Sequence, residues 1–183
     1  VDVFATALVS VQPDDFNDQT NSNNRYFDSN FHGIYFSDKT LFSKGKVDLW
    51  WFLRENSQAN DLINTYGAKY TLTQGNFSYD IQGSFQNGTF NDVKHSAYYA
   101  HLGLGYKLDQ HKFGIAYNLS SGDGDASDNE HETFDNLYAL NHAYYGYMDL
   151  FSLQNIHNLE LTYQQANFRI ALQSFWLNEV DGL

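Results

Sequence analysis

Residues 77–86 read FSYDIQGSFQ, and apolar and polar side chains alternate along this stretch almost without interruption. Successive side chains of a β-strand point to opposite faces of the sheet, so the stretch predicts a strand with one apolar face and one polar face. Most other segments of strand length in the chain alternate in the same way. Two architectures produce this pattern: a sandwich that buries its apolar faces between two sheets, and a transmembrane barrel that turns them toward lipid.

The alternation predicts roughly ten antiparallel strands connected as up-and-down hairpins. Tight turns are expected at residues 74–76 and 109–110, and a polar loop is expected at residues 13–24. Helix is expected nowhere except for a turn near residues 57–63. The predicted strands are residues 1–12, 26–36, 46–54, 66–73, 77–86, 97–108, 112–119, 144–151, 158–164 and 168–176.

The composition suits a barrel better than a sandwich. Only 42% of the 183 residues are apolar and the mean hydropathy is −0.53, yet 17% are aromatic, with 14 Tyr, 15 Phe and 3 Trp. In a barrel half of each strand faces water and aromatic residues concentrate at the two membrane interfaces. No segment reaches the roughly 18 to 20 apolar residues of a membrane helix, which excludes a helical membrane protein.

Charge and cysteine content exclude further classes. The net charge of −12 argues against nucleic acid as a partner, because such proteins gather Lys and Arg. The absence of cysteine excludes disulfides and thiol chemistry.

Strand length and the placement of tyrosines also favour the barrel. Strands of about nine to twelve residues match a tilted membrane crossing and exceed the five or six residues typical of sandwiches. Tyrosines gather near predicted strand ends, at 98, 99, 144, 145 and 147, where an interfacial girdle would lie. We therefore expect lipid to contact the faces that carry Ile81, Leu104, Tyr106 and Phe113. The opposite faces carry the predicted pore-lining residues, namely Lys46, Asp48, Arg54, Lys69, Asp80, Lys107, Lys112 and Arg169.

Three segments around the longest loop carry a family resemblance. Residues 117–125 read YNLSSGDGD, residues 132–138 read ETFDNLY and residues 141–150 read NHAYYGYMDL. This block resembles the alginate-export family of outer-membrane porins. The resemblance implies a passive channel in the outer membrane of a Gram-negative bacterium, for a polyanionic saccharide or a similar solute. Barrels of that family have roughly eighteen strands, so residues 1–183 are expected to form one β-barrel domain that is part of a larger barrel.

The charge balance departs from that family. Alginate exporters line the pore with many basic residues, because opposite charge steers a polyuronate. This chain has 10 Lys and Arg against 22 Asp and Glu, and Asp48, Asp80 and Glu160 share the predicted inner face with the cations. The sequence therefore predicts a pore for polar or anionic solutes that is less anion-selective than an alginate exporter. It supports an outer-membrane channel more strongly than it supports alginate as the solute.

The acidic residues of the loop suggest a calcium-binding site. Asp123, Asp125 and Ser127 have the one-three-five spacing of a calcium loop, but Asp128 stands where an EF-hand needs Gly and Phe134 stands where it needs Glu. A solvated loop is the simpler interpretation, and weak divalent bridging to lipopolysaccharide is a third. We expect no dedicated metal site.

The loop 120–142, extracellular or folded into the pore, offers no catalytic arrangement. Glu132, Thr133, Asp135 and His142 supply acids, a hydroxyl and an imidazole, but no Ser-His-Asp order or oxyanion turn surrounds them. We expect Phe134 to pack the loop, with no catalytic residue and no cofactor. The adjacent Trp50 and Trp51 must point to opposite faces, so one would meet lipid and the other the pore, where it would either pack or stack on a sugar ring.

The sequence thus predicts an all-β, antiparallel, up-and-down transmembrane barrel that acts as an outer-membrane channel. Its expected partners are outer-membrane lipid, lipopolysaccharide, the solute and periplasmic export proteins. The alternative is a soluble or surface-attached β-sandwich that binds carbohydrate through exposed Tyr and Trp.

Overall fold

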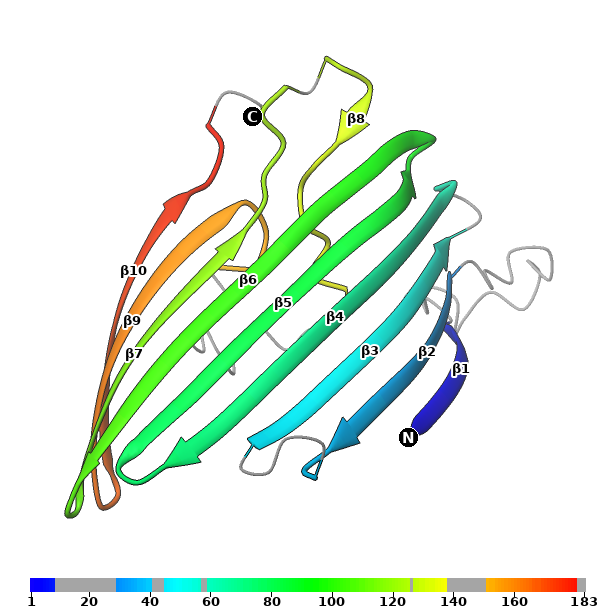
Figure 1. The fold of residues 1–183 in the computed structure, drawn as a ribbon. Helices are drawn as coiled ribbons and strands as arrows, with labels where there is room; N and C mark the ends of the chain where they lie inside the picture. The colour runs from blue at the N-terminus through cyan, green and yellow to red at the C-terminus, as the bar shows by residue number, and fades with distance from the viewer. Residues whose placement is uncertain (9–28, 41–44, 57–58, 126, 138–150, 181–183) are drawn as a thin grey trace, which may run out of the picture.

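A computed structural model describes residues 1–8, 29–40, 45–56, 59–125, 127–137 and 151–180. These residues form ten strands and no helix (Figure 1). The strands are β1 (Asp2–Leu8), β2 (Ser29–Asp38), β3 (Gly45–Asn56), β4 (Asp61–Gln74), β5 (Phe77–Phe90), β6 (Val93–Leu108), β7 (His111–Ser120), β8 (Glu130–His131), β9 (Ile156–Gln165) and β10 (Phe168–Leu177). Since no described segment is helical, none is a long apolar helix able to cross a membrane.

All ten strands belong to one sheet, with neighbours in the order β1-β2-β3-β4-β5-β6-β7-β9-β10. Every neighbouring pair on this path is antiparallel, and the two-residue β8 pairs with β6 in parallel. The sheet curves along its width, and among the described residues β1 and β10 do not pair with each other (Figure 1). The prediction of an all-β, antiparallel, up-and-down architecture is confirmed. The described strands form an open sheet.

Tight turns set the register of three hairpins. The sequence predicted two of these turns and missed the third. Residues 75–76 and 109–110 connect their hairpins as expected. Asn91 and Asp92 both have positive φ, 49° and 66°, which is the backbone of a type I′ hairpin turn. Phe90 and Val93 therefore pair directly, and the hairpin is longer at this end than the predicted strands 77–86 and 97–108.

Other predicted strand bounds differ from the structure. β2 continues to residue 38, beyond the predicted end at residue 36, and β4 begins at residue 61, although a helical turn was expected near residues 57–63 and a strand only from residue 66. Residues 9–12 of the first predicted strand and residues 26–28 of the second lie outside the described part. The predicted strand 144–151 also lies outside it, apart from Phe151, which is in no strand.

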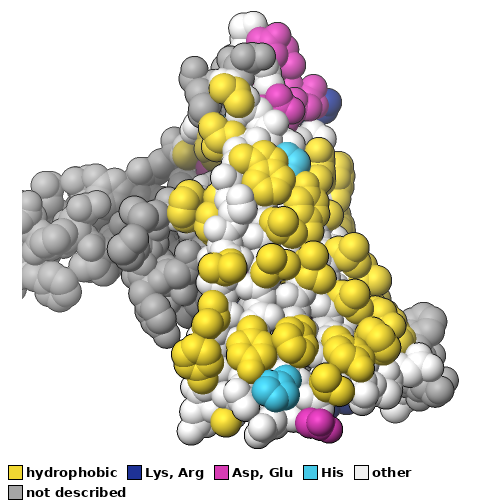
Figure 2. Space-filling model, turned by 90° about the vertical axis from the view of Figure 1, so that its left-hand side faces the viewer, with side chains coloured by type: hydrophobic (Ala, Val, Ile, Leu, Met, Phe, Trp, Pro, Cys, Tyr) yellow, Lys and Arg dark blue, Asp and Glu magenta, His cyan; other side chains and the backbone are white. Residues whose placement is uncertain are grey.

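The sheet has an apolar face whose side chains are open to the surroundings. The four side chains expected to meet lipid belong to it: Tyr106 is 37% exposed, Leu104 42%, Phe113 47% and Ile81 50%. Figure 2 shows such side chains as a broad apolar band, with acidic side chains toward its ends. A sandwich would cover these residues with a second sheet, but all the described strands lie in one sheet.

Aromatic side chains form two rows across the apolar face. One row, near the ends where residues 75–76 and 109–110 turn, contains Phe77, Tyr106, Phe113 and Tyr163, which are successive cross-strand partners. The other row contains Trp51, Tyr66, Phe85 and Tyr98. Phe77 and Phe85 are eight residues apart on β5, so the rows are separated by about 27 Å along the strand.

The opposite face, called here the polar face, contains most of the buried residues. Nine polar or charged residues are buried among the described ones, against five hydrophobic residues. Gln86 and Ser120 are fully buried, and His95 and Asn158 are 1% exposed. The usual distribution of a soluble domain is therefore reversed, because the larger apolar side chains face outward and the polar ones pack together.

Candidate functional site

The predicted pore-lining residues all belong to the polar face, since the strand registers place them on one side of the sheet. One cross-strand row runs from Asp48 through Lys69, Gln82 and His101 to Asn118. A row nearer the short turns runs from Lys107 through Lys112 and Gln164 to Arg169. Lys46, Arg54 and Asp80 lie on the same face, at positions an even number of residues from these rows.

Most cations of the polar face are paired with a carboxylate. Lys46 Nζ is 2.8 Å from Asp48, and Lys69 Nζ is 2.8 Å from Asp80. Arg169 lies 3.4 Å from Glu160, which also accepts a 2.6 Å hydrogen bond from Gln173 Nε2. Pairing of this kind reduces the field that a passing anion would meet.

Lys107 and Lys112 are the exception. Both side chains are exposed, and the two residues are cross-strand partners at the short-turn end of β6 and β7. Neither forms an ion pair with a described residue. They therefore carry positive charge at one rim of the polar face, with no described carboxylate within ion-pair distance.

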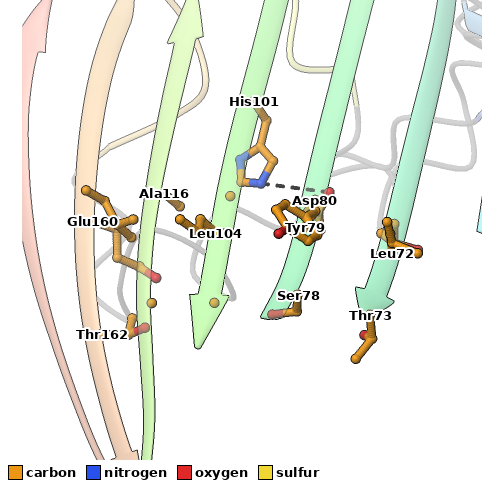
Figure 3. Close-up of a pocket in the computed structure, with 15 residues that line it drawn as sticks. Leu72, Thr73, Ser78, Tyr79, Asp80, His101, Leu104, Ala116, Glu160 and Thr162 are labelled. Atoms are coloured by element: carbon orange, nitrogen blue, oxygen red, sulfur yellow. Dashed lines mark ion pairs between the residues drawn. The ribbon is translucent and has the colours of Figure 1, made fainter. Parts of the chain in front are cut away.

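A cavity of about 350 Å³ lies on the polar face between β4 and β9. Figure 3 shows His101 of β6 directed toward Asp80 of β5, with Glu160 and Thr162 on the far wall. Three glycines, at 103, 105 and 114, line it where larger side chains would fill the space. Asp80 Oδ1 is buried and accepts no hydrogen bond in the described structure, and His101 Nε2 is 3.9 Å away. The cavity is therefore lined by neutral hydroxyls and glycines beside the carboxylate residues Asp80 and Glu160.

Residues 130–135 of the long loop lie against the polar face. Phe134 is 6% exposed and packs against Ala97 and Tyr99, at a ring-centroid distance of 5.8 Å from Tyr99. Gln86 fixes the next residue, because its Nε2 donates to the Asp135 carbonyl at 2.7 Å and its Oε1 accepts from the Asp135 amide at 2.8 Å. Phe134 thus packs the loop as the sequence predicted.

Arg54 joins this segment to the sheet. Its guanidinium lies 3.1 Å from Asp61 and 2.8 Å from Asp135, and the three side chains are 17%, 6% and 11% exposed. A largely buried cation between two carboxylates compensates both negative charges. Loss of the cation would leave the two carboxylates facing each other.

Two histidines form a second connection. His95 Nδ1 is 2.9 Å from His131 Nδ1, so one imidazole donates and the other accepts. The His131 ring also stacks on Phe90 at a centroid distance of 4.1 Å. Burial lowers the pKa of His131, although Asp123, Asp135 and Asp61 oppose the shift. The short parallel pairing of β8 with β6 holds this contact in place.

The calcium candidates do not form a cluster. Asp123 accepts from the Asp125 amide at 3.1 Å, and Asp125 accepts from the amide and hydroxyl of Ser127 at 3.0 and 2.6 Å. These are local turn contacts of the kind that Asp and Ser form with their own backbone. Across the described residues, no three His, Asp or Glu side chains gather as metal ligands would. Glu132 is exposed, and His142 lies outside the described part.

Sequence reasoning placed Tyr99 wrongly in an interfacial girdle. It is 9% exposed on the polar face, where its hydroxyl donates to Asn118 at 3.0 Å, whereas Tyr98 is on the apolar face. The alternation placed Gln86 and Asn118 on the polar faces of their strands. It did not predict that the amides of Gln86, Asn118 and Asn158 are buried, or that Asn118 donates to Asn158 at 2.9 Å.

The comparison with protein families agrees with this two-faced sheet. The model of the family described as alginate export matches residues 1–182, and the chain therefore belongs to this family. A search of curated proteins and a search of solved structures each found no significant match.

Proposed function

We propose that this chain forms part of the wall of a β-barrel channel in the outer membrane of a Gram-negative bacterium. The observation that carries the proposal is the reversed burial, with apolar side chains exposed on one face and polar side chains gathered on the other. In a transmembrane barrel lipid covers the first face and water meets the second. Outer-membrane lipid and lipopolysaccharide are accordingly its proposed partners on the apolar face.

The two aromatic rows support this placement. Transmembrane barrels carry an apolar band about 25 Å tall, flanked by aromatic girdles at both interfaces. A separation of about 27 Å along strands tilted by about 40° corresponds to roughly 20 Å across the membrane. The rows thus fall near the two edges that such a band requires.

The edges of the sheet support a barrel with more strands. A strand edge left open in lipid would expose unpaired backbone groups at a cost of several kcal/mol each, so a membrane sheet must close. β1 and β10 do not pair with each other in the described structure. We therefore propose that further strands of the full-length protein complete the ring, and that residues 1–183 are one part of it.

The proposed solute is a polar or anionic molecule, with an anionic polysaccharide such as alginate as the leading case. The family description supports the polysaccharide, and the free Lys107 and Lys112 supply positive charge at one rim. Farther along the polar face the cations are neutralised by carboxylates, so this wall would bind a polyanion only weakly. Weak binding is what passage through a channel requires. Residues 130–135 would narrow the path, since they pack on the polar face. Periplasmic export proteins remain proposed partners.

Replacing both rim lysines tests the channel directly. In planar bilayers, the Lys107→Ala/Lys112→Ala variant of the full-length protein is expected to shift the reversal potential in a salt gradient toward cation preference. The anion-to-cation permeability ratio should fall by about twofold, because two charges near the path are lost and salt screens them only in part.

Lys39 provides a matched control, because it is an exposed lysine outside the strands at the same end of the sheet. Lys39→Ala should leave the reversal potential unchanged. Equal shifts in both variants would reject the rim assignment, and absence of any ion conductance in the wild-type protein would reject the channel.

A further inference from the structure

Five aromatic side chains lie together on the polar face of β1, β2 and β3, where a pore wall would otherwise be polar. This group, called here the aromatic platform, consists of Phe4, Phe31, Tyr35, Trp50 and Phe52, all partly exposed. Phe4, Phe31 and Phe52 form a triangle with ring-centroid distances of 5.2 to 5.8 Å. Trp50 lies 6.3 Å from Tyr35 and 6.5 Å from Phe52, with interplanar angles of 13° and 21°.

Three rings of the platform lie over glycines of the sheet. A Cβ atom added at Gly67, the cross-strand partner of Trp50, would be 2.1 Å from the indole ring. One added at Gly33 would be 2.5 Å from the Phe52 ring and 2.6 Å from the Phe4 ring. Glycine at both positions lets the rings touch the backbone. Trp50 and Phe52 therefore lie side by side on the sheet as near-parallel rings, and both remain partly exposed.

Charged side chains border the platform. Asp48 and Lys69 form the next row of the polar face, two residues from the Trp50–Gly67 pair and therefore about 7 Å away. Asp48 forms side-chain hydrogen bonds with Lys46, Ser37 and Tyr35. An aromatic surface with amines at its edge matches a molecule that is apolar on its faces and polar around its rim.

We propose that the aromatic platform binds pyranose rings of the transported polysaccharide, an inference that rests on the proposed channel function. A pyranose has a face of C–H groups, and an aromatic ring has a negative π face, so the two attract when they stack. The hydroxyl and carboxylate groups at the sugar rim would meet the partly exposed amines of Lys46 and Lys69. Conduction of small inorganic ions does not explain the platform, because aromatic rings would bind such ions no better than polar side chains do.

The two adjacent tryptophans give a matched test in the full-length protein. Trp50 is on the polar face, and Trp51 is on the apolar face, where its indole nitrogen donates to Asn64 at 3.0 Å. Block of single-channel current is measured with three probes of equal length: a uronate oligosaccharide, a neutral gluco-oligosaccharide and oligoglutamate. Trp50→Leu should raise the half-blocking concentration of both saccharides by about three- to tenfold, without changing that of oligoglutamate. Trp51→Leu should change none of the three.

Each other outcome is decisive. Unchanged saccharide block in Trp50→Leu, or an equal loss of block for oligoglutamate, would overturn the platform while leaving the channel intact. Failure of the wild-type protein to conduct ions would instead overturn the channel. If Trp50→Leu yields no conducting protein, Tyr35→Leu applies the same test to a neighbouring ring, with the same expected loss of saccharide block and the same refuting result.

Discussion

An arginine in place of Leu161 is expected to lower the free energy of unfolding in lipid vesicles by about 1 to 3 kcal/mol, between the cost of a cation at the midplane of a barrel's lipid face and the smaller cost near an interface. Leu161 is 47% exposed near the middle of β9, and its cross-strand partners Ile115 and Leu172 are also exposed and apolar. The effect is measured by urea titration of the full-length protein folded into vesicles.

Thr162→Arg is the matched control. Thr162 is the next residue along β9 and lines the cavity of the polar face, where an added cation would meet water and Glu160. Its unfolding free energy should remain within about 0.5 kcal/mol of wild type. Similar losses in the two variants would show that lipid does not discriminate between the faces of β9.

Removal of the Arg54 side chain is the second large expected effect. Arg54→Ala leaves the largely buried Asp61 and Asp135 unpaired at close range, which should cost about 3 to 5 kcal/mol. Because Asp135 belongs to the loop segment and Asp61 to β4, the segment is expected to detach before the sheet unfolds. Faster amide hydrogen exchange at residues 130–137, with unchanged exchange in β5, would report this.

Lys94→Ala controls for loss of any cation near the same segment. Lys94 pairs with Glu130 at 2.6 Å, but the lysine side chain is 69% exposed, and exposed pairs contribute at most about 1 kcal/mol. Its exchange rates should stay close to wild type. Protection of residues 130–137 that survives in Arg54→Ala would show that the guanidinium does not hold the segment.

Side-chain alternation was sufficient to predict the sheet and its two faces. A one-residue shift of any strand would move its apolar set to the polar face, so the alternation specifies register strongly. Ile81 and Asp80 were therefore assigned to opposite faces correctly from the sequence. The hairpin end at Asn91 and Asp92 was missed because the alternation is reversed there, with Phe90 and Val93 on the polar face and Thr89 and Lys94 on the other.

The contacts of the loop could not be predicted from the sequence. β8 pairs with β6 in parallel across 36 residues of chain, and no local pattern specifies such a pairing. Gln86 was recognised as polar and inward-facing, but its two hydrogen bonds to Asp135 depend on where a distant segment packs. Likewise, opposite orientations for Trp50 and Trp51 followed from their adjacency, whereas the flat contact with Gly67 required the register of β3 and β4.

The account depends most on the claim that lipid covers the apolar face and water meets the polar face. These 183 residues contain no cysteine, so spin labels can be attached at single cysteines introduced along β5, from residue 79 to residue 85. Collision rates with oxygen, which concentrates in lipid, and with a water-soluble nickel complex are then measured in vesicles. We expect oxygen contact to peak at 79, 81, 83 and 85, and nickel contact to peak at 80, 82 and 84. Nickel contact at every position, or oxygen contact without alternation, would contradict the account.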